Sequence, residues 1–433
     1  MYIVQVNQFD FHGGASQVAL NIHNYLLAHH HESIFWVQNK SLSDPNILEI
    51  PLSAPIKTIW ADLIWKIYEP LSCRIGYRRT KFLYDLMDPL GAWQRSRGFE
   101  VFHFPGSKKI LSMKNKSPDV VHLHNLHENY FDLRFLPALS NKVPTVITMH
   151  DEWLYTGHCA YTLKCERWKI GCGDCPDLTI YPKIPRDGSK HNWEQKNQIF
   201  KDSTLCIVTP SIWLKNRAQQ SLIANGNIQY KHIPNGIDQD IFKPTIRKIS
   251  RKKMGIKDDT FVICCQGVGD FNSNKFKDFA TLKKCVNIIL DRIGEEKILI
   301  LCFGSNQLKE EFESEKVETR GFIKDRNALA QIYCAADVYL HPAHSEVFGL
   351  DITVALSCST PGIASSVGGI PEIIQHGVNG FLVDEMDAES MANFVIMLIK
   401  NKDLLNKFKL NAISTSRPFY SVSRMVNDYL SLY

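Results

Sequence analysis

Short apolar runs alternate with longer amphipathic stretches along this chain, and the alternation is its clearest structural signal. In the first half the apolar runs predict five strands, at Tyr2–Gln8, Ser33–Val37, Val120–His124, Thr145–Met149 and Leu205–Thr209. Much of the sequence between them is typical of helix. Strands that alternate with helices favour a parallel sheet that is covered on both faces.

The second half repeats this alternation. Its apolar runs predict six strands, at Phe261–Gln266, Ile298–Phe303, Val317–Gly321, Asp337–His341, Gly362–Ala364 and Gly380–Val383. Helices are predicted between them at Phe279–Arg292, Asn327–Ala335 and Leu350–Ser357. The pattern therefore predicts an α/β protein with two sheets.

The turn Pro234–Asp238, followed by a basic stretch that ends at Lys253, predicts the break between the two halves. We place a first lobe at residues 1–240 and a second at 241–416. Residues 417–433 begin with an Arg-Pro pair and predict one terminal helix. Two lobes agree with the length of 433 residues, which is too long for one ordinary core.

Composition narrows the possible classes of protein. Hydrophobic residues make up 44% and charged residues 22%, as in a globular protein. A net charge of +5 is too small for the dense basic face that binds nucleic acid, so we expect no nucleic-acid partner. The first residues lack a secretion signal, and no apolar run approaches the roughly 18 residues of a membrane span. We expect a cytoplasmic protein, with the inner face of the membrane as the place of any membrane association.

Residues 56–116 depart from this mild charge balance. Twelve Lys or Arg stand against five Asp or Glu there, interleaved with aromatic residues such as Trp60, Trp65 and Trp93. Such a mixture suits peripheral contact with an anionic membrane, or an acidic lipid-linked acceptor. A basic solvated face over an apolar helical core explains the pattern equally well.

Two strand ends in the first half carry residues suited to ligand binding. Gly13 and Gly14 lie between a strand and a helix, where backbone amides can approach an anion. His150 and Asp151 follow the strand Thr145–Met149, at the edge where open α/β sheets bind ligands. His150 can orient a sugar hydroxyl and Asp151 can cap the next segment, although a structural use of both also fits the sequence.

Polar residues gather at the end of the strand Val120–His124. Alternation puts His122 and His124 on one face, and Asn125 and His127 follow them. They can line an acceptor pocket or chelate a metal. We favour acceptor contacts from His124, Asn125 and His127.

A loop at residues 158–176 contains four cysteines. They are Cys159, Cys165, Cys172 and Cys175. Four thiols that end in a Cys-x2-Cys turn can surround a tetrahedral ion. We favour a structural zinc, with His158 as a substitute ligand; disulfides and free buried thiols are the alternatives.

The strand Phe261–Gln266 is followed by a polar loop that reaches Lys277, beside the predicted helix Phe279–Arg292. A lysine at a helix N-terminus opposes the helix dipole unless an anion satisfies both, as a diphosphate would. Lys275 is a second cation in the same loop. Exposed lysines are also common without any ligand.

Segment Ser345–Glu372 says most about function. It starts a short helix with Glu346 and a glycine, passes through a Thr-Pro turn into a small strand, and ends in a Gly-Gly-x-Pro turn. Free amides at such a helix start lie beside a carboxylate, an arrangement suited to a ligand with both hydroxyls and a phosphate.

This segment resembles the donor-sugar segment of glycosyltransferase family 4, which has two glutamates separated by seven residues. The first is Glu346 here, and Val354 replaces the second. The Gly-Gly loop, the His-Asp pair, the Pro-Asn-Gly-Ile-Asp turn and the lysine loop also occur in family order. The resemblance implies the GT-B fold, with two Rossmann-like lobes, an interdomain cleft and a last helix that returns to the first lobe.

The resemblance also implies roles for the candidate residues. Glu346 and His150 would position the donor sugar, and Lys277 would stabilise the departing diphosphate. The other donor-binding residues would be Gly13, Gly14, Lys275, Gly321, Phe322, Phe348, Gly349, Leu350 and Asp351. Lys275 is the cation nearest to an arginine that the family has in the lysine loop, and Asp278 replaces the usual glycine. We hypothesise that Asp351 partly compensates for the glutamate replaced at Val354.

The implied activity is transfer of a hexose or related sugar, with retention of configuration. The donor would be a nucleotide-diphosphate sugar and the acceptor a glycan or lipid-linked saccharide of a bacterial surface polysaccharide. No catalytic metal is implied. The departures at Val354 and near Lys275 motivate an alternative, a weakly active or inactive member that binds glycan or nucleotide in an assembly complex.

Overall fold

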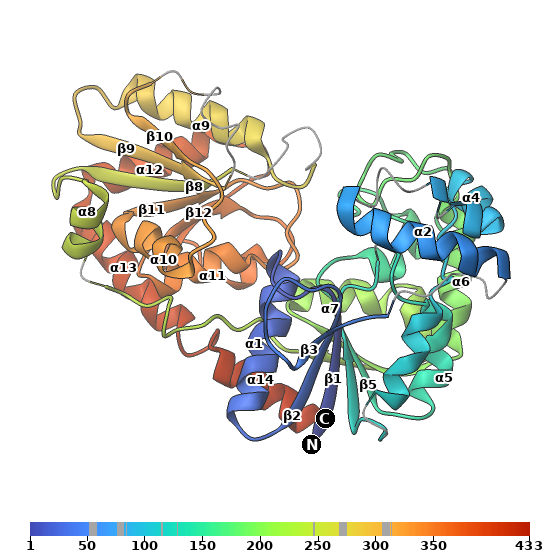
Figure 1. The fold of residues 1–433 in the computed structure, drawn as a ribbon. Coiled ribbons are helices and arrows are strands. Elements are labelled where there is room, and N and C mark those ends of the chain that lie inside the picture. The colour runs from blue at the N-terminus through green and yellow to red at the C-terminus, as the bar shows by residue number, and fades with distance from the viewer. Residues whose placement is uncertain are drawn as a thin grey trace. The chain divides into compact units, whose positions relative to one another are not determined.

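A computed structural model of the chain describes all residues except 52–58, 76–81, 84, 114–115, 128, 246, 268–274, 305–311 and 313. Tyr77 and Tyr84, which belong to the predicted basic and aromatic segment, lie outside the described residues. The chain forms two compact units (Figure 1). The first lobe contains Met1–Thr209, Lys215–Lys231 and Tyr433, and the second contains Pro210–Leu214 and His232–Leu432.

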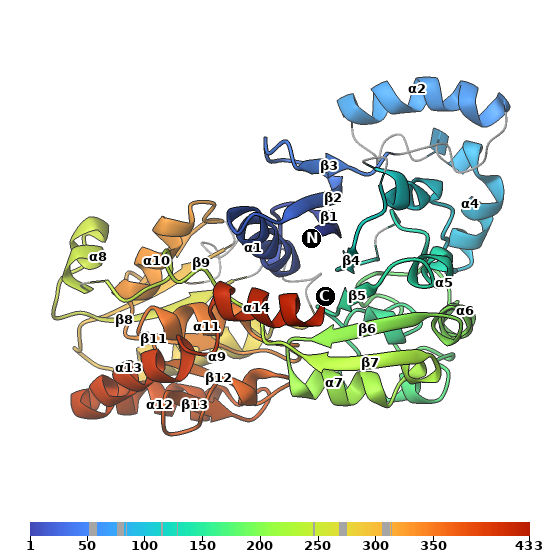
Figure 2. The same cartoon turned by 90° about the horizontal axis from the view of Figure 1, so that it is seen from below.

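The first lobe is built on a seven-stranded sheet in the order β3-β2-β1-β4-β5-β6-β7. Its strands are β1 Tyr2–Phe9, β2 Glu32–Asn39, β3 Ile47–Glu49, β4 Val120–Leu123, β5 Thr145–Thr148, β6 Thr204–Thr209 and β7 Asn227–His232. Pairing is parallel from β3 to β6. All five predicted strands are confirmed. The sequence did not predict β3, which is very short, or β7, which lies beside β6 (Figure 2) and contains few apolar residues.

Helices connect these strands. They are α1 Gly14–Ala28, α2 Ile59–Ile75, α4 Pro89–Ser96, α5 Leu136–Ser140, α6 Ser189–Lys201 and α7 Ile212–Gln219. Single 3₁₀ turns or short 3₁₀ helices occupy Pro105–Ser112, Leu133–Phe135, Trp153–Tyr155, Arg167–Lys169 and Leu222–Asn225. The boundary between the two units falls within α7.

The second lobe has a six-stranded parallel sheet in the order β10-β9-β8-β11-β12-β13. Its strands are β8 Phe261–Gln266, β9 Ile298–Phe303, β10 Val317–Arg320, β11 Val338–His341, β12 Gly362–Ser365 and β13 Gly380–Val383. Its helices are α8 Arg247–Met254, α9 Phe279–Arg292, α10 Arg326–Ala335, α11 Leu350–Ser357, α12 Ala388–Lys400, α13 Lys402–Ser416 and α14 Val422–Leu432, with a 3₁₀ turn at Ile370–Glu372. The six predicted strands and three predicted helices are confirmed.

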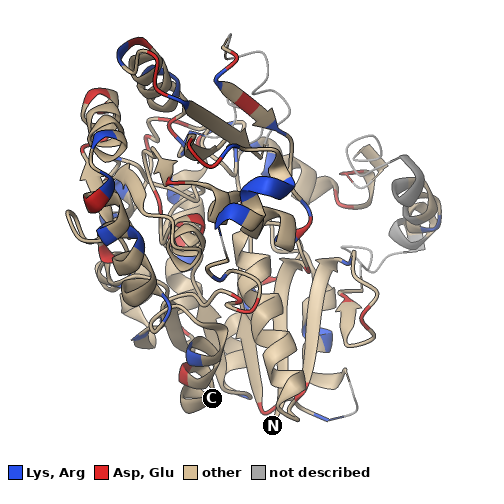
Figure 3. Cartoon of the chain, turned by 90° about the vertical axis from the view of Figure 1, so that its left-hand side faces the viewer, with Lys and Arg blue, Asp and Glu red and all other residues tan. Residues whose placement is uncertain are grey.

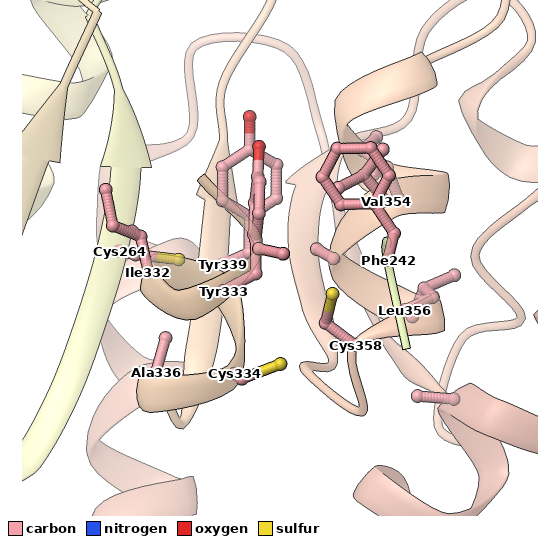
Figure 4. Packing of buried hydrophobic residues seen from close by; sticks show 14 of the residues in the cluster. Phe242, Cys264, Ile332, Tyr333, Cys334, Ala336, Tyr339, Val354, Leu356 and Cys358 are labelled. Atoms are coloured by element: carbon pink, nitrogen blue, oxygen red, sulfur yellow. The ribbon is translucent and has the colours of Figure 1, made fainter. Parts of the chain in front are cut away.

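Alternating residues of the central strands fill two separate cores on the two faces of the second sheet. Val262 and Cys264 of β8 pack in a cluster with residues of α10 and α11 (Figure 4). Ile263 and Cys265 point to the other face, into a cluster with residues of α9 and α12. Burial on both faces explains why β8 reads as a continuous apolar run.

Side-chain caps fix where several helices of the second lobe begin. Asp278, Asp325, Asp387 and Asn401 each accept a hydrogen bond from a backbone amide in the first turn of the following helix. Such caps satisfy amides that have no partner inside the helix. The cap at Asp278 is important for the site, because it fixes the residue after Lys277.

The terminal helix predicted at 417–433 is α14, which belongs to the second lobe. Only Tyr433 belongs to the first lobe, where its hydroxyl lies 2.6 Å from Nδ1 of His122. The predicted packing of this helix on the first lobe, and the predicted interdomain cleft, stay predictions.

Charged residues of both signs are interspersed on the side of the protein shown in Figure 3. In the part of the chain that the structure describes, no helix combines the length and apolar character that a bilayer span requires.

Candidate functional site

The order of strands in the second lobe predicts where a ligand binds. Strand β8 lies between β9, which follows it in sequence, and β11. In an open parallel sheet such a change in direction leaves a crevice at the carboxyl ends of the central strands. The segments that leave β8 and β11 there contain Lys277 and Glu346, two of the predicted site residues.

Backbone pairing brings these two segments together. Lys277 forms an antiparallel bridge with Ala343, and the amide of His344 donates to the carbonyl of Phe276 at 2.8 Å. Asp278 then caps α9 by accepting from the amide of Thr281 at 2.9 Å. The aspartate that replaces the glycine of the family pattern therefore has a structural use.

Lys277 and Glu346 form an ion pair, with 2.7 Å between Nζ and Oε2. Their side chains are 22% and 17% exposed, so the pair is shielded but within reach of a ligand. Burial alone would raise the pKa of Glu346, but the charge of Lys277 and a hydrogen bond from His341 outweigh it and lower that pKa. Burial would lower the pKa of Lys277, yet Glu346 and Asp351 raise it. Both groups are charged at neutral pH.

His341 is a site residue that the sequence reasoning missed. It ends β11, and its Nε2 lies 3.4 Å from Oε2 of Glu346, while its Nδ1 lies 3.1 Å from the hydroxyl of Tyr339. Burial, assisted by the charge of Lys277, lowers the pKa of His341, so the ring is neutral. Its position at the carboxyl end of a strand, the same signal that pointed to His150, could have identified it.

Asp351 lies in the first turn of α11, near the same charged groups. Burial raises the pKa of Asp351, although Lys277 and His341 act in the opposite direction. The charge of Asp351 and the charges of the Lys277–Glu346 pair therefore influence one another. Its proposed compensation for the missing glutamate stays a hypothesis.

The N-terminus of α11 directly follows this ion pair. Gly349 caps the helix with φ 98°, a left-handed conformation that favours glycine, and Leu350 is the first helical residue. Phe348 before it is buried. The first amides of a helix lack an acceptor one turn earlier. In α11 the amide of Ile352 donates to the carbonyl of Gly349 at 3.1 Å, which leaves the amides of Leu350 and Asp351 for a ligand.

The Gly-Gly turn packs against the backbone carbonyl of Glu346. A Cβ atom at Gly368 would lie 1.8 Å from the carbonyl oxygen of Glu346, and the amide of Gly369 donates to that oxygen at 2.9 Å. No larger residue fits at position 368 without moving the Glu346 backbone. The sequence signal at the end of the segment therefore reflects close approach of two chain segments.

Val354 is buried in the apolar cluster on the α11 face of the sheet, with 6% of its surface exposed. Figure 4 shows it among the other side chains of this cluster, including Phe242 and Leu356. The position of the second family glutamate therefore belongs to the core here.

The remaining predicted donor residues of the second lobe lie on loops. Gly321 follows β10, and its carbonyl accepts from the amide of Gly304 at 3.1 Å. Phe322 is 62% exposed, which leaves its ring available for stacking. Lys275 is exposed, two residues before Lys277.

The first lobe presents its own strand ends. Gly13 caps α1 with φ 85°, and Gly14 is the first residue of that helix. A Cβ atom at Gly13 would meet no atom within 4 Å, so its backbone conformation, not lack of space, favours glycine here. Strand β1 lies between β2 and β4, so Gly13 and Gly14 follow a strand at the change of direction in this sheet.

His124 and His150 are in contact, with Nδ1 of His124 3.0 Å from Nε2 of His150. His124 is buried, and its other ring nitrogen lies 3.3 Å from the side-chain amide of Gln5. Burial lowers the pKa of His150 to about 4, so its ring is neutral at physiological pH. His124 therefore supports His150 structurally, and its direct contact with an acceptor stays a prediction.

His127 and Asp151 form a second pair, 2.9 Å between Nε2 and Oδ2. Asp151 also accepts from the amide of Trp153 at 2.9 Å, as expected of a cap. The carbonyl of Asn125 accepts from the hydroxyl of Tyr130. The structure thus orders the predicted acceptor residues His127 and Asn125 but does not test what they bind.

The four cysteines of the predicted zinc loop line one small cavity of about 20 Å³ together with His158, whose Nε2 lies 3.3 Å from Sγ of Cys175. All four carry free thiols. Burial raises the pKa of Cys172 to about 11, which keeps that thiol protonated. Among the described residues, no three His, Cys, Asp or Glu side chains form a group that could hold a metal ion. The zinc ion therefore stays a prediction from the sequence.

Two α/β lobes built on parallel sheets, with the candidate site residues at the carboxyl ends of their strands, are the architecture of the GT-B fold. A solved structure of Anabaena HepE in complex with UDP-glucose has this fold, with a TM-score of 0.62 and 16% identity over 100% of both chains. Residues 263–401 match the family model of glycosyl transferases group 1. The chain therefore carries a group 1 glycosyltransferase domain at these residues.

Two relatives match most of the chain. The putative colanic acid biosynthesis glycosyl transferase WcaC of Escherichia coli strain K12 is 26% identical over 74% of this chain and 77% of its own length. An uncharacterized 41.2 kDa protein in the cps region of Klebsiella pneumoniae is 25% identical over 75% of this chain and 81% of its own. Other relatives match over less than half of their own length.

Restoring the second glutamate of the family pattern by Val354→Glu is expected to destabilise the protein. A carboxylate without a partner in this apolar cluster should cost about 3–5 kcal/mol of unfolding free energy. Thermal or denaturant unfolding measures the loss. Val378→Glu is the matched control, because Val378 is 38% exposed and should change stability by less than about 0.5 kcal/mol. A Val354→Glu protein as stable as the wild type would show that this position is open to solvent.

The zinc prediction is tested by elemental analysis of protein purified without chelators. The expected result is one zinc ion for each chain, lost in a Cys172→Ser, Cys175→Ser double variant. Metal-free protein with all four loop thiols reactive after unfolding would overturn the prediction in favour of free thiols. Metal-free protein with fewer than four reactive loop thiols after unfolding would instead support disulfides.

Proposed function

We propose that this protein is a glycosyltransferase that moves a sugar from a nucleotide-diphosphate donor to a glycan or lipid-linked acceptor in surface polysaccharide biosynthesis. The Lys277–Glu346 ion pair at the carboxyl edge of the second sheet is the observation that carries the proposal. It combines a cation and a carboxylate within 2.7 Å, shortly before the N-terminus of α11. The diphosphate of a nucleotide sugar can bind the cation, and the hydroxyls of its sugar can donate to the carboxylate.

The ion pair has a different role with and without the donor. A diphosphate carries more negative charge than one carboxylate, so it competes for the ammonium group of Lys277. Glu346, whose pKa is lowered, stays ionised and can only accept hydrogen bonds. Sugar hydroxyls supply the donors that it then needs.

The departing diphosphate is stabilised by positive groups that are already in place. Lys277 and the first-turn amides of α11 would face the negative charge that develops as the sugar–phosphate bond breaks. His150 in the first lobe is neutral, so it can exchange a hydrogen bond with a sugar hydroxyl without adding charge. We propose transfer with retention, as the family resemblance implies.

The comparisons support the choice of donor and pathway. HepE, which has the same fold, was solved with UDP-glucose, so UDP-glucose is the first donor to test. One relative is named for colanic acid biosynthesis and another comes from a cps region. These names favour a polysaccharide acceptor for this chain.

Burial of Val354 favours one alternative, a weakly active or inactive member that binds nucleotide or glycan in an assembly complex. Without the second glutamate, the nucleotide loses a charge-assisted hydrogen bond of roughly 1.5–3 kcal/mol. A loss of this size weakens binding without abolishing the reaction.

Glu346→Gln is expected to lower kcat/KM for sugar transfer by about ten- to a few hundredfold, because a neutral amide replaces the carboxylate that accepts from the sugar. Product analysis with a panel of UDP-, GDP- and ADP-sugars measures the loss. Glu389→Gln is the matched control, since Glu389 is an exposed glutamate that pairs with Arg292 in the same lobe. Full transfer activity in Glu346→Gln would contradict the site assignment.

Thermal-shift measurements with UDP, GDP and ADP separate the proposed enzyme from the alternative. Stabilisation by one nucleotide, together with turnover of the matching sugar donor, is expected of the enzyme. Stabilisation without turnover of any donor, given a suitable acceptor extract, would favour the binding partner.

A further inference from the structure

One ring nitrogen of His341 faces two groups with opposite demands. Its Nε2 lies 3.3 Å from Nζ of Lys277 and 3.4 Å from Oε2 of Glu346. An ammonium group can only donate a hydrogen bond, and an ionised carboxylate can only accept one. A neutral imidazole nitrogen donates when it carries the proton and accepts when it does not. Nε2 therefore satisfies only one of its two neighbours at a time.

The ring of His341 carries a single proton. The side chain is buried, and burial together with the charge of Lys277 lowers its pKa, although Glu346 and Asp351 act in the opposite direction. A neutral ring has its proton at Nδ1 or at Nε2. With the proton at Nδ1, Nε2 accepts from Lys277. With the proton at Nε2, the ring donates to Glu346.

Tyr339 is compatible with either position of the proton. Its hydroxyl lies 3.1 Å from Nδ1 of His341, and a hydroxyl can both donate and accept. Tyr339 is buried, and its ring centroid lies 5.5 Å from that of Tyr333 in the cluster of Figure 4. This packing keeps the hydroxyl at Nδ1, so the ring of His341 has the same orientation in both tautomers.

A bound phosphate would remove the competition at Nε2. In the proposed function, on which this inference rests, the ammonium group of Lys277 turns to the diphosphate of the donor. Glu346 then loses the partner that lies 2.7 Å from its Oε2. Of the two groups near Nε2 of His341, the carboxylate stays in place.

We propose that His341 is a positioning residue for Glu346, and that a diphosphate at Lys277 commits His341 to the tautomer with its proton at Nε2. In this tautomer the ring donates to Oε2 of Glu346, which leaves Oε1 to accept from sugar hydroxyls. One proton leaves Nδ1 for water and one from water is gained at Nε2, so the ring stays neutral. Tyr339 changes from acceptor to donor at Nδ1.

Two substitutions of His341 test the positioning role. They are a matched pair, because glutamine has its amide nitrogen about where the ring has Nε2, and asparagine about where the ring has Nδ1. We expect His341→Asn to lower kcat/KM for sugar transfer about tenfold, and His341→Gln to stay within about threefold of the wild type. Both should bind UDP, GDP or ADP as the wild type does, since Lys277 is unchanged.

Two results of this comparison would overturn the proposal. One is wild-type kcat/KM in His341→Asn. The other is an equal loss in His341→Asn and His341→Gln when both are folded by circular dichroism, because glutamine keeps the donor at the position of Nε2.

Tyr339→Phe tests the contact at Nδ1. We expect kcat/KM to fall about three- to tenfold, because the ring then lacks the hydroxyl that serves both tautomers. Tyr230→Phe is the matched control: it removes a hydroxyl of β7 in the first lobe that has no hydrogen-bond partner among the described residues. Wild-type activity in Tyr339→Phe would contradict the role of Tyr339.

Nitrogen NMR of histidine-labelled protein measures the tautomer directly, because protonated and unprotonated ring nitrogens differ in chemical shift. The signals of His341 are those that disappear in His341→Gln. Without ligand, Nε2 should be partly unprotonated in the wild type and fully protonated in Lys277→Met, which lacks the ammonium group. Adding UDP, GDP or ADP to the wild type should move the signals toward those of Lys277→Met. The same tautomer in all samples, or a ring protonated at both nitrogens, would overturn the proposal.

Failure of this inference can be distinguished from failure of the proposed function. The comparison of the wild type with Lys277→Met requires no nucleotide, so it tests the tautomer in a protein that transfers no sugar. Wild-type protein that neither binds a nucleotide nor transfers a sugar would contradict the proposed function. Active wild-type protein with unimpaired His341 variants would contradict only the role of His341.

Discussion

The ion pair between Lys277 and Glu346 is the interaction on which the proposed function of the second lobe depends. It lies where two loops leave neighbouring strands, and it is fixed on both sides by backbone contacts. The bridge from Lys277 to Ala343 aligns one loop, and the close approach of Gly368 to the Glu346 carbonyl aligns the other. The two charged side chains already lie at the site before the ligand binds. A phosphate of the ligand can then take the place of Glu346 beside Lys277, and its hydroxyls the place of Lys277 beside Glu346, at a small cost in free energy. The glycines, the Asp278 cap and the start of α11 can all be understood as support for this one contact.

The candidate site histidines of both lobes are buried, neutral rings that are held by neighbouring side chains. His341 bridges Tyr339 and Glu346, while His150 contacts His124, which in turn lies beside Gln5. Burial lowers the pKa of each of these three histidines, so all are neutral hydrogen-bonding groups at physiological pH. Neutral rings can orient hydroxyls without disturbing the charge balance that the ion pair sets. Buried partners hold them in one orientation.

Much of the fold could be predicted from the sequence, because strands buried on both faces leave continuous apolar runs. The strands β8 and β9 are clear examples, whereas β7 alternates polar and apolar residues and lacks such a run. Lys277 and Glu346 could also be predicted, since each lies at a recognisable turn next to a helix. Contacts between distant parts of the chain could not be predicted. The burial of Val354 depends on a cluster that includes Phe242, more than one hundred residues earlier in the chain. His341 was missed although it occupies the same kind of strand end as His150.

The central claim is that Lys277 serves the diphosphate of the donor, and nucleotide binding by Lys277→Met measures it most directly. Calorimetry with the nucleoside, its monophosphate and its diphosphate gives the affinity that each phosphate adds. Wild-type protein should bind the diphosphate much more tightly than the nucleoside, and Lys277→Met should lose at least about tenfold of that gain while binding the nucleoside equally well. If Lys277→Met binds the diphosphate as tightly as the wild type does, the ion pair has no part in donor recognition, and the claim is wrong.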